Sequence, residues 1–109
     1  MKRIHIALAV KDFAASVADY TSRLGVEPCC TVEGAYALWR TDQANLSISV
    51  KPEEAGKLRH LGFEDSDAGA FSEEIDSSGF TWERFSADQQ RREIVNLWPH
   101  AKFVAGSTR

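Results

Sequence analysis

Apolar and polar residues alternate along the first ten positions of the chain, a pattern typical of a β-strand with one buried face. The apolar face is formed by Ile4, Ile6, Leu8 and Val10. The opposite face carries His5 together with the small residues Ala7 and Ala9. We therefore expect the first strand to present a histidine on its less hydrophobic side.

An amphipathic helix is predicted next, over residues 13–24. Its apolar residues recur at i, i+4, i+7 and i+11, and they are Phe13, Val17, Tyr20 and Leu24. Asp12 precedes the first turn as a suitable N-cap, and Gly25 suits the left-handed position that ends many helices. The stripe predicts that this helix covers the apolar face of the strands.

Period-two alternation continues after the helix and predicts three more strands. They lie near residues 27–33, 35–41 and 45–50, before a polar connector at 52–56. In the last of these strands, Leu46, Ile48 and Val50 alternate with Asn45, Ser47 and Ser49. A strand containing LRHLGF follows the connector, and it places His60 on the face opposite Leu61 and Phe63.

Several landmarks recur after about half the chain, which indicates an internal duplication. His5 and His60 are 55 positions apart, and so are Asp12 and Asp67. The second half is therefore predicted to contain a helix over residues 67–79 that begins after Asp67 and ends at Gly79. Its remaining strands are expected near residues 80–86, 92–98 and 102–105.

The fold class predicted by these elements is α+β. One domain of residues 1–109 would consist of two βαβββ modules, 1–54 and 55–109, whose helices lie outside a curved sheet. The other face would form a cup of small side chains in which a small molecule binds. The candidate ligand-binding residues are Ala7, Trp39, Ser47, Ser49, Trp82 and Trp98. Alternation alone does not decide which face the tryptophans occupy.

Charge and length exclude several functional classes. The 109 residues carry a formal charge of −3 without a basic stripe, so nucleic acid is not an expected partner. The apolar run at the amino terminus is too short for a secretory core or a membrane span. A small soluble domain is the class that fits.

The two cysteines, Cys29 and Cys30, are neighbours, which does not build a disulfide framework and favours a reducing cytoplasm. Adjacent thiolates are also able to bind soft ions such as As(III) or Cd²⁺. The alternative is that both act as small hydrophobic residues in a strand.

The segments IHIALAVKDFAASVADYTSRLGV and LRHLGFE, each with a histidine in the first strand of a module, resemble the vicinal oxygen chelate superfamily. That superfamily includes glyoxalases, bleomycin-resistance proteins and extradiol dioxygenases. The stretch KPEEAGKLRHLGFE is similar to the branch of cadmium-induced proteins and organoarsenical carbon–arsenic lyases. The resemblance implies a homodimer that binds a small molecule.

The resemblance also implies a divalent metal held by one residue from the first strand and one carboxylate from the last strand of each module. His5 and His60 occupy the first pair of positions, whereas Ser47 and Ala105 stand where the carboxylates are expected. The prediction is therefore a degenerate site with no metal or a weakly held Zn, Ni, Mn or Fe ion. An alternative register, with 92–98 as the last strand, brings Glu93 or Asn96 toward the metal.

Three functions remain open at this point. The first is a metal-free binder of a small apolar or aromatic molecule. The second is a lyase, isomerase or dioxygenase in which His5 and His60 hold a divalent metal. The third is resistance to a soft toxic ion through Cys29 and Cys30.

Overall fold

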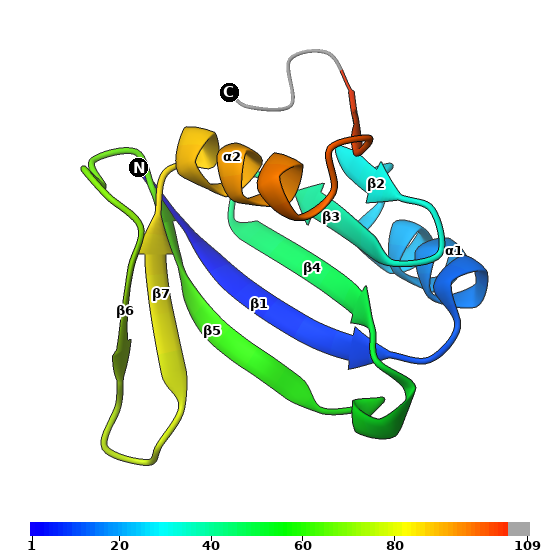
Figure 1. The fold of residues 1–109 in the computed structure, drawn as a ribbon, viewed down its shortest axis with the longest axis horizontal. Coiled ribbons are helices and arrows are strands. Elements are labelled where there is room, and N and C mark those ends of the chain that lie inside the picture. The colour runs from blue at the N-terminus through cyan, green and yellow to red at the C-terminus, as the bar shows by residue number, and fades with distance from the viewer. Residues whose placement is uncertain (105–109) are drawn as a thin grey trace.

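The computed structural model describes residues 1–104, which form one curved, mixed sheet with two helices (Figure 1). The strands are β1 (Lys2–Val10), β2 (Cys30–Val32), β3 (Tyr36–Arg40), β4 (Ala44–Val50), β5 (Leu58–Asp65), β6 (Ser72–Ile75), β7 (Thr81–Phe85) and β8 (Lys102–Phe103). The helices are α1 (Phe13–Leu24), α2 (Ala87–Leu97) and the short 3₁₀ turn η1 (Pro52–Glu54). The order across the sheet is β6-β7-β5-β1-β4-β3-β2-β8. The expected α+β class with a curved sheet is confirmed.

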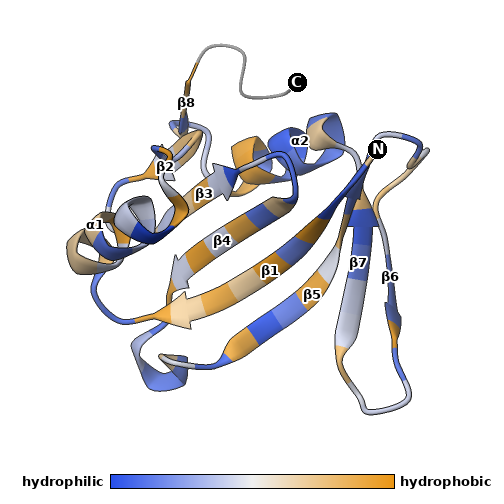
Figure 2. Ribbon diagram, turned by 180° about the vertical axis from the view of Figure 1, so that it is seen from behind, coloured by the Kyte–Doolittle hydropathy of each residue, from blue (hydrophilic) through white to orange (hydrophobic). Residues whose placement is uncertain are grey.

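The first half of the chain folds as its pattern predicts. Asp12 caps α1 by accepting a hydrogen bond from the backbone N–H of Ala15, and Gly25 ends the helix at φ 73°. The apolar stripe of α1 packs on a cluster whose buried members are Val10, Ala37, Trp39 and Ile48. The alternating hydropathy of β1 is visible as banding in Figure 2. One face of the sheet is thereby covered, and the face that carries His5 is left for other contacts.

The two halves repeat one pairing pattern at the centre of the sheet. β1 pairs in parallel with β4, and β5 pairs in parallel with β7. The two first strands, β1 and β5, lie side by side and antiparallel. This arrangement brings the halves of the chain together at the strands that contain the two histidines.

The predicted helix over 67–79 is wrong. The segment contains a turn, in which the Asp65 carboxylate accepts from the backbone N–H of Asp67, and then the edge strand β6. Asp76 accepts from the backbone N–H groups of Ser78 and Phe80, and Gly79 has φ 92° in the hairpin before β7. These side-chain contacts give the backbone an alternative to a helix whose apolar stripe is thin.

The predicted strand at 92–98 is also wrong, because this segment belongs to α2. Ser86 and Gln89 form a reciprocal capping box that starts the helix, and Ile94 is buried against β2 and β3. Helix α2 therefore covers part of the sheet face opposite α1 (Figure 1), so the expectation that both helices lie outside the cup is wrong for α2. Within residues 1–104, neither helix has the length and hydrophobicity needed to cross a bilayer.

The last strand was predicted as part of the second half of the sheet, but it pairs elsewhere. β8 pairs with β2 of the first half instead of extending the second half, whose final central strand is β7. The position of Ala105, where a metal-binding carboxylate was expected, lies outside the described residues. The strand equivalent to β4 in the second half is therefore β7, and its side chains are the ones that face the histidines.

Candidate metal site

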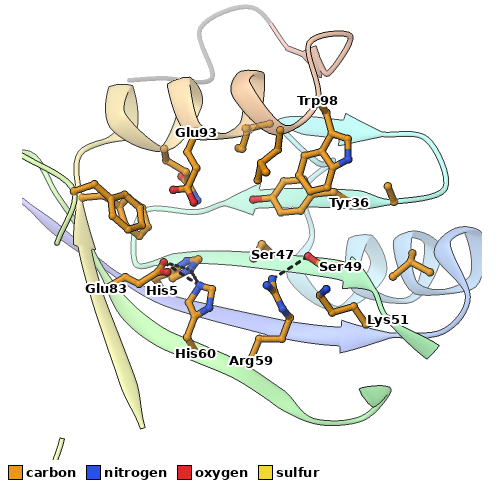
Figure 3. A pocket seen from close by; sticks show the side chains of 17 residues that line it. His5, Tyr36, Ser47, Ser49, Lys51, Arg59, His60, Glu83, Glu93 and Trp98 are labelled. Carbon is orange, nitrogen blue, oxygen red and sulfur yellow. Dashed lines mark hydrogen bonds and ion pairs between the residues drawn. The ribbon is translucent and has the colours of Figure 1, made fainter. Parts of the chain in front are cut away.

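An open cleft of about 420 Å³ lies between α2 and the face of the sheet that carries His5. Its floor is formed by residues of β1, β4, β5 and β7, and its opposite wall is formed by α2 (Figure 3). The volume falls within the range of small-molecule sites, which is about 300–1,000 Å³. The cleft has the size and position of the cup that the sequence predicts.

Three donor side chains converge at one end of this cleft. His5 Nε2 lies 3.0 Å from His60 Nε2. The carboxylate atom Glu83 Oε1 lies 2.9 Å from His60 Nε2 and 3.8 Å from His5 Nε2. Figure 3 shows the three side chains pointing toward one another from β1, β5 and β7. Each therefore offers one ligand atom to the same small volume.

Strand register explains why these side chains meet. His5 pairs with Gly62 of β5, and Gly62 pairs in turn with Glu83 of β7. His60 lies two residues from Gly62 on the same face. A Cβ at Gly62 would overlap the backbone carbonyl oxygen of Glu83, so glycine allows β7 to approach. The strand carrying Glu83 is thus held close to both histidines.

The hydrogen bonds of His5 select its tautomer. His5 Nδ1 lies 2.9 Å from Asn45 Oδ1 and 3.1 Å from the Asn45 carbonyl oxygen. Because both of these atoms are acceptors, Nδ1 carries the proton and donates it, and Nε2 keeps its lone pair. Burial lowers the pKa of His5 below its ordinary value, against the opposing effect of the Asn45 hydrogen bond. The imidazole is therefore neutral near pH 7, with its free nitrogen directed at His60.

A buried carboxylate fixes the orientation of Asn45. Glu64 Oε1 accepts from Asn45 Nδ2 at 2.9 Å, so the carboxamide oxygen of Asn45 must face His5. Glu64 is 4% exposed, and its carboxylate accepts two hydrogen bonds from Arg40 and one from Arg3. Gln90 of α2 also bonds to Asn45. These hydrogen bonds connect the partly buried Arg3 and Arg40 to the tautomer of His5.

The donor set fits a divalent ion. Donors about 2.0–2.1 Å from a tetrahedral zinc lie roughly 3.3 Å from one another, a spacing that the three atoms bracket at 2.9, 3.0 and 3.8 Å. Two imidazoles and one carboxylate also leave a position open. Without an ion, the proton on His60 Nε2 is donated to the acceptors Glu83 Oε1 and His5 Nε2. Binding of an ion would therefore require this proton to leave Nε2, for example by a change of the His60 tautomer to Nδ1–H.

Glu83 was missing from the candidates that the sequence provided. The expected carboxylate positions were Ser47 and Ala105, with Glu93 or Asn96 as alternatives. Ser47 lines the cleft from β4, and the exposed residue Glu93 faces it from α2, whereas Asn96 is exposed and does not line this cleft. Alternation in the strand 80–86 could have identified Glu83, because it places Glu83 and Trp82 on opposite faces and so offers a carboxylate to one of them.

The other expected ligand-binding residues divide between the two faces. Ser47, Ser49 and Trp98 line the cleft. Ala7 is buried on the same face of the sheet, where it pairs with Ser47 on one side and His60 on the other. Trp98 ends α2 instead of lying in a strand, and its ring is 5.1 Å from that of Tyr36.

Trp39 and Trp82 lie on the opposite face, so neither forms a wall of the cleft. Trp39 packs under α1, where its indole N–H donates to Thr21. Trp82 stacks on Phe63, and its indole N–H donates to Asp76. Their orientation follows from alternation with their neighbours Leu38 and Glu83, which face the α2 side.

The two cysteines lie away from the donor cluster. Cys30 is buried in the apolar cluster beneath α2, and Cys29 packs against the same cluster. Burial raises the pKa of both thiols, that of Cys30 to about 12. Because the thiolate is the form that binds soft ions, this environment disfavours the soft-metal hypothesis.

Comparisons with known proteins show the fold. Neither the protein-family models nor the curated proteins contain a match. The chain is similar to a structure described as an NAD-dependent benzaldehyde dehydrogenase from Legionella pneumophila, with a TM-score of 0.52 and 12% identity, covering 76% of this chain and 97% of that one. It is also similar to a glyoxalase / bleomycin resistance protein from Catenulispora acidiphila DSM 44928, with a TM-score of 0.45 and 27% identity, covering 75% of this chain and 96% of that one. At 12% identity the first similarity shows a shared fold and says nothing of activity.

Proposed function

We propose that this protein is a divalent-metal-dependent enzyme of the vicinal oxygen chelate superfamily that acts on a small molecule with two adjacent oxygen donors. The observation that carries the proposal is the convergence of His5, His60 and Glu83 at one end of an open cleft. The degenerate-site hypothesis depended on the absence of a carboxylate, and Glu83 removes that premise. The narrower similarity to the cadmium-induced and arsenic-lyase branch remains a proposal on sequence alone.

The chain's own groups suit an acid–base reaction beside the metal. When bound, a divalent ion supplies a Lewis acid for a chelating pair of substrate oxygens. His5 is held neutral and oriented by Asn45, and Glu93 faces the cleft from α2. Partial desolvation and the nearby Glu83 charge raise the pKa of Glu93 above its ordinary value, the direction that favours exchange of a proton with substrate. Isomerisation or lyase chemistry through a proton alpha to a carbonyl fits this arrangement best.

Metal uptake tests the proposal directly. Protein stripped with EDTA and titrated calorimetrically with Zn²⁺, Ni²⁺, Mn²⁺ or Fe²⁺ is expected to bind one equivalent per chain. Acetohydroxamic acid, which chelates metals through two adjacent oxygens, should then perturb the visible spectrum of a Co²⁺-loaded sample. Failure of every ion to bind at micromolar concentration contradicts the proposal.

Substituting glutamine for Glu93 is expected to slow proton transfer without loss of metal. Hydroxyacetone is a suitable probe because its carbonyl and hydroxyl oxygens are adjacent, and its exchange of carbon-bound protons for deuterium can be followed by ¹H NMR. The Glu93→Gln variant should exchange about 10²–10⁴-fold more slowly, the usual contribution of a positioned acid–base group. Glu53→Gln, which removes the same charge from the exposed η1 turn, is the control. Equal rates in the two variants would exclude Glu93 as the base.

We also propose that the protein forms a homodimer. Because residues 67–79 form no helix, the face of β5 and β7 that carries Phe63 and Trp82 lacks the cover that α1 gives to the first half. Ile75 and Phe80 of the β6–β7 hairpin are 72% and 49% exposed. Ile75→Asp is expected to shift the mass seen by sedimentation toward one chain, whereas Val104→Asp is the matched exposed control. A monomeric parent protein would contradict the dimer.

A further inference from the structure

The end of the cleft away from the donor cluster is basic. Lys51, directly after β4, and Arg59, near the start of β5, both line it. Arg59 Nη1 donates to Ser49 Oγ at 3.1 Å, a bond that passes across β1, because β1 lies between β4 and β5. Figure 3 shows the Arg59 guanidinium and the Lys51 ammonium near Ser49, away from Glu83 and Glu93.

A β-bulge places Arg59 on this face. Ala7 pairs with His60 and Leu8 pairs with Leu58, so Arg59 is an extra residue with no partner on β1. Strict alternation would direct Arg59 and His60 to opposite faces of the sheet. The bulge instead allows both consecutive side chains to line the cleft. The small side chain of Ala9, which pairs with Ser49, leaves room above β1 for Arg59 to reach across.

Within the part of the chain that the structure describes, neither Lys51 nor Arg59 has a carboxylate within ion-pair distance, although the charge of Arg59 acts on Glu93 at longer range. Among residues 1–104, the arginines at 3, 23, 40 and 84 each form an ion pair, whereas Lys51 and Arg59 form none. In the same range, Arg91 and Arg92 also form no ion pair, but they line other hollows and not the cleft that holds the donor cluster. Two cations beside one hydroxyl in a cleft form an arrangement suited to an anion.

We propose that Lys51, Arg59 and Ser49 bind the anionic group, a carboxylate or phosphonate, of the small molecule that this cleft accepts. The inference rests on the proposed function for the other end of the ligand, where its oxygen pair meets the donor cluster. Tyr36 and Trp98 line the wall formed by β3 and α2, so the body of the ligand between these ends is apolar or aromatic. In protein stripped of metal, Glu83 and Glu93 make the donor end acidic, so an anion is expected at Lys51 and Arg59 instead.

The anion site can be tested without metal. In EDTA-stripped protein, phenylacetate and its neutral analogue phenylacetamide are titrated while the backbone N–H signals of Ser49, Lys51 and Arg59 are followed by NMR. Phenylacetate is expected to bind at least roughly tenfold more tightly than the amide, and its affinity should fall with added salt. Lys51→Gln and Arg59→Gln should each weaken phenylacetate roughly tenfold and leave phenylacetamide unchanged.

Arg23→Gln is the matched control, because it removes one positive charge from the exposed surface of α1 on the other side of the sheet. Equal affinity for the two compounds, equal effects of the cleft and control variants, or no saturation by phenylacetate at tens of millimolar would each overturn the proposal. Metal uptake is measured separately in every variant. If the parent protein binds no metal, the proposed function is contradicted, whereas the anion site is still decided by the phenylacetate titrations.

Discussion

Glu83→Ala is expected to reduce divalent-metal affinity by more than about 100-fold while the protein remains folded. The remaining donors, His5 and His60, are two imidazoles, and catalytic zinc sites usually have three protein ligands. Loss of an outer partner alone costs about 10–100-fold, so loss of a ligand should exceed this range. The Glu83 side chain is 14% exposed and its carboxylate contacts the two histidines, so its truncation should disturb little else.

Calorimetric titration with Zn²⁺ measures this effect, and the thermal midpoint of the stripped protein checks the fold. Glu74→Ala is the matched control, because it removes the same charge from the neighbouring strand at an exposed position that pairs with Trp82 instead of Glu83. His5→Ala and His60→Ala are expected to lose binding as Glu83→Ala does. Wild-type affinity in Glu83→Ala would show that this carboxylate is not a ligand.

The convergence of His5 and His60 was predictable because it depends on strong local signals. Each lies in a strand whose alternation is clear, and the offset of 55 residues relates the two strands. Two first strands related by duplication pair side by side at the centre of the sheet, and their outward residues then share a face. The tautomer of His5 was not predictable, since it depends on Asn45 and Glu64, which only the fold brings to it.

Glu83 was not among the candidates because the segment after it is compatible with either a strand or a helix. In RREIVNLW the apolar residues fit a short strand, and this choice moved the last central strand to 102–105. Ser86 and Gln89 have the spacing of a capping box, a signal for a helix start that outweighs the short apolar run. With 87–97 assigned to a helix, the strand before it must be the partner of β5, and Glu83 then faces the histidines.

The bulge at Arg59 was not predictable from alternation. A bulge breaks the period of two on which the assignment of faces depends, and LRHLGF contains no local residue pattern that marks it. Arg59 was therefore not among the candidate ligand-binding residues. Strand alternation predicts the cup and the pair of histidines at one end of it. The bulge, a departure from regular pairing, places Arg59 at the other end.

Glu64→Gln is expected to destabilise the protein by about 3–5 kcal/mol, because it leaves Arg40 and Arg3 buried beside a neutral amide. The side chains of Glu64, Arg40 and Arg3 are 5%, 8% and 13% exposed, so solvent cannot replace the lost charge. Urea unfolding at pH 7 measures the change. Asp19→Asn is the control, since it breaks the exposed Asp19–Arg23 pair, which should contribute less than about 1 kcal/mol. Similar losses in the two variants would contradict a structural role for the buried carboxylate.

The same carboxylate should make stability depend on pH. Burial raises the pKa of Glu64, but the hydrogen bonds of Arg40 and Asn45 and the charges of Arg40 and Arg3 outweigh it and hold the pKa below its ordinary value of 4.5. A pKa that is lower in the folded state contributes stability above the unfolded value and loses it as the pH falls through the folded value. The difference in unfolding free energy between wild type and Glu64→Gln should therefore be largest near neutral pH and shrink below about pH 4.5. A constant difference from pH 7 to pH 3 would show that the charge of Glu64 is not responsible.

The network also predicts that Glu64→Gln affects the metal site from a distance. A glutamine amide can donate to Asn45, which removes the requirement that the carboxamide oxygen of Asn45 faces His5. His5 Nδ1 then keeps only the Asn45 carbonyl oxygen as an assured acceptor, so its tautomer is held less firmly. Metal affinity should fall about tenfold, the lower end of the effect of losing an outer hydrogen-bond partner of a ligand. NMR of the His5 ring nitrogens in stripped protein distinguishes this cause from general loosening. The two variants thus separate two roles. Glu83→Ala removes a metal donor and leaves the stability of the fold unchanged. Glu64→Gln lowers both the stability of the fold and the metal affinity, because Glu64 orients the ligand His5 through Asn45.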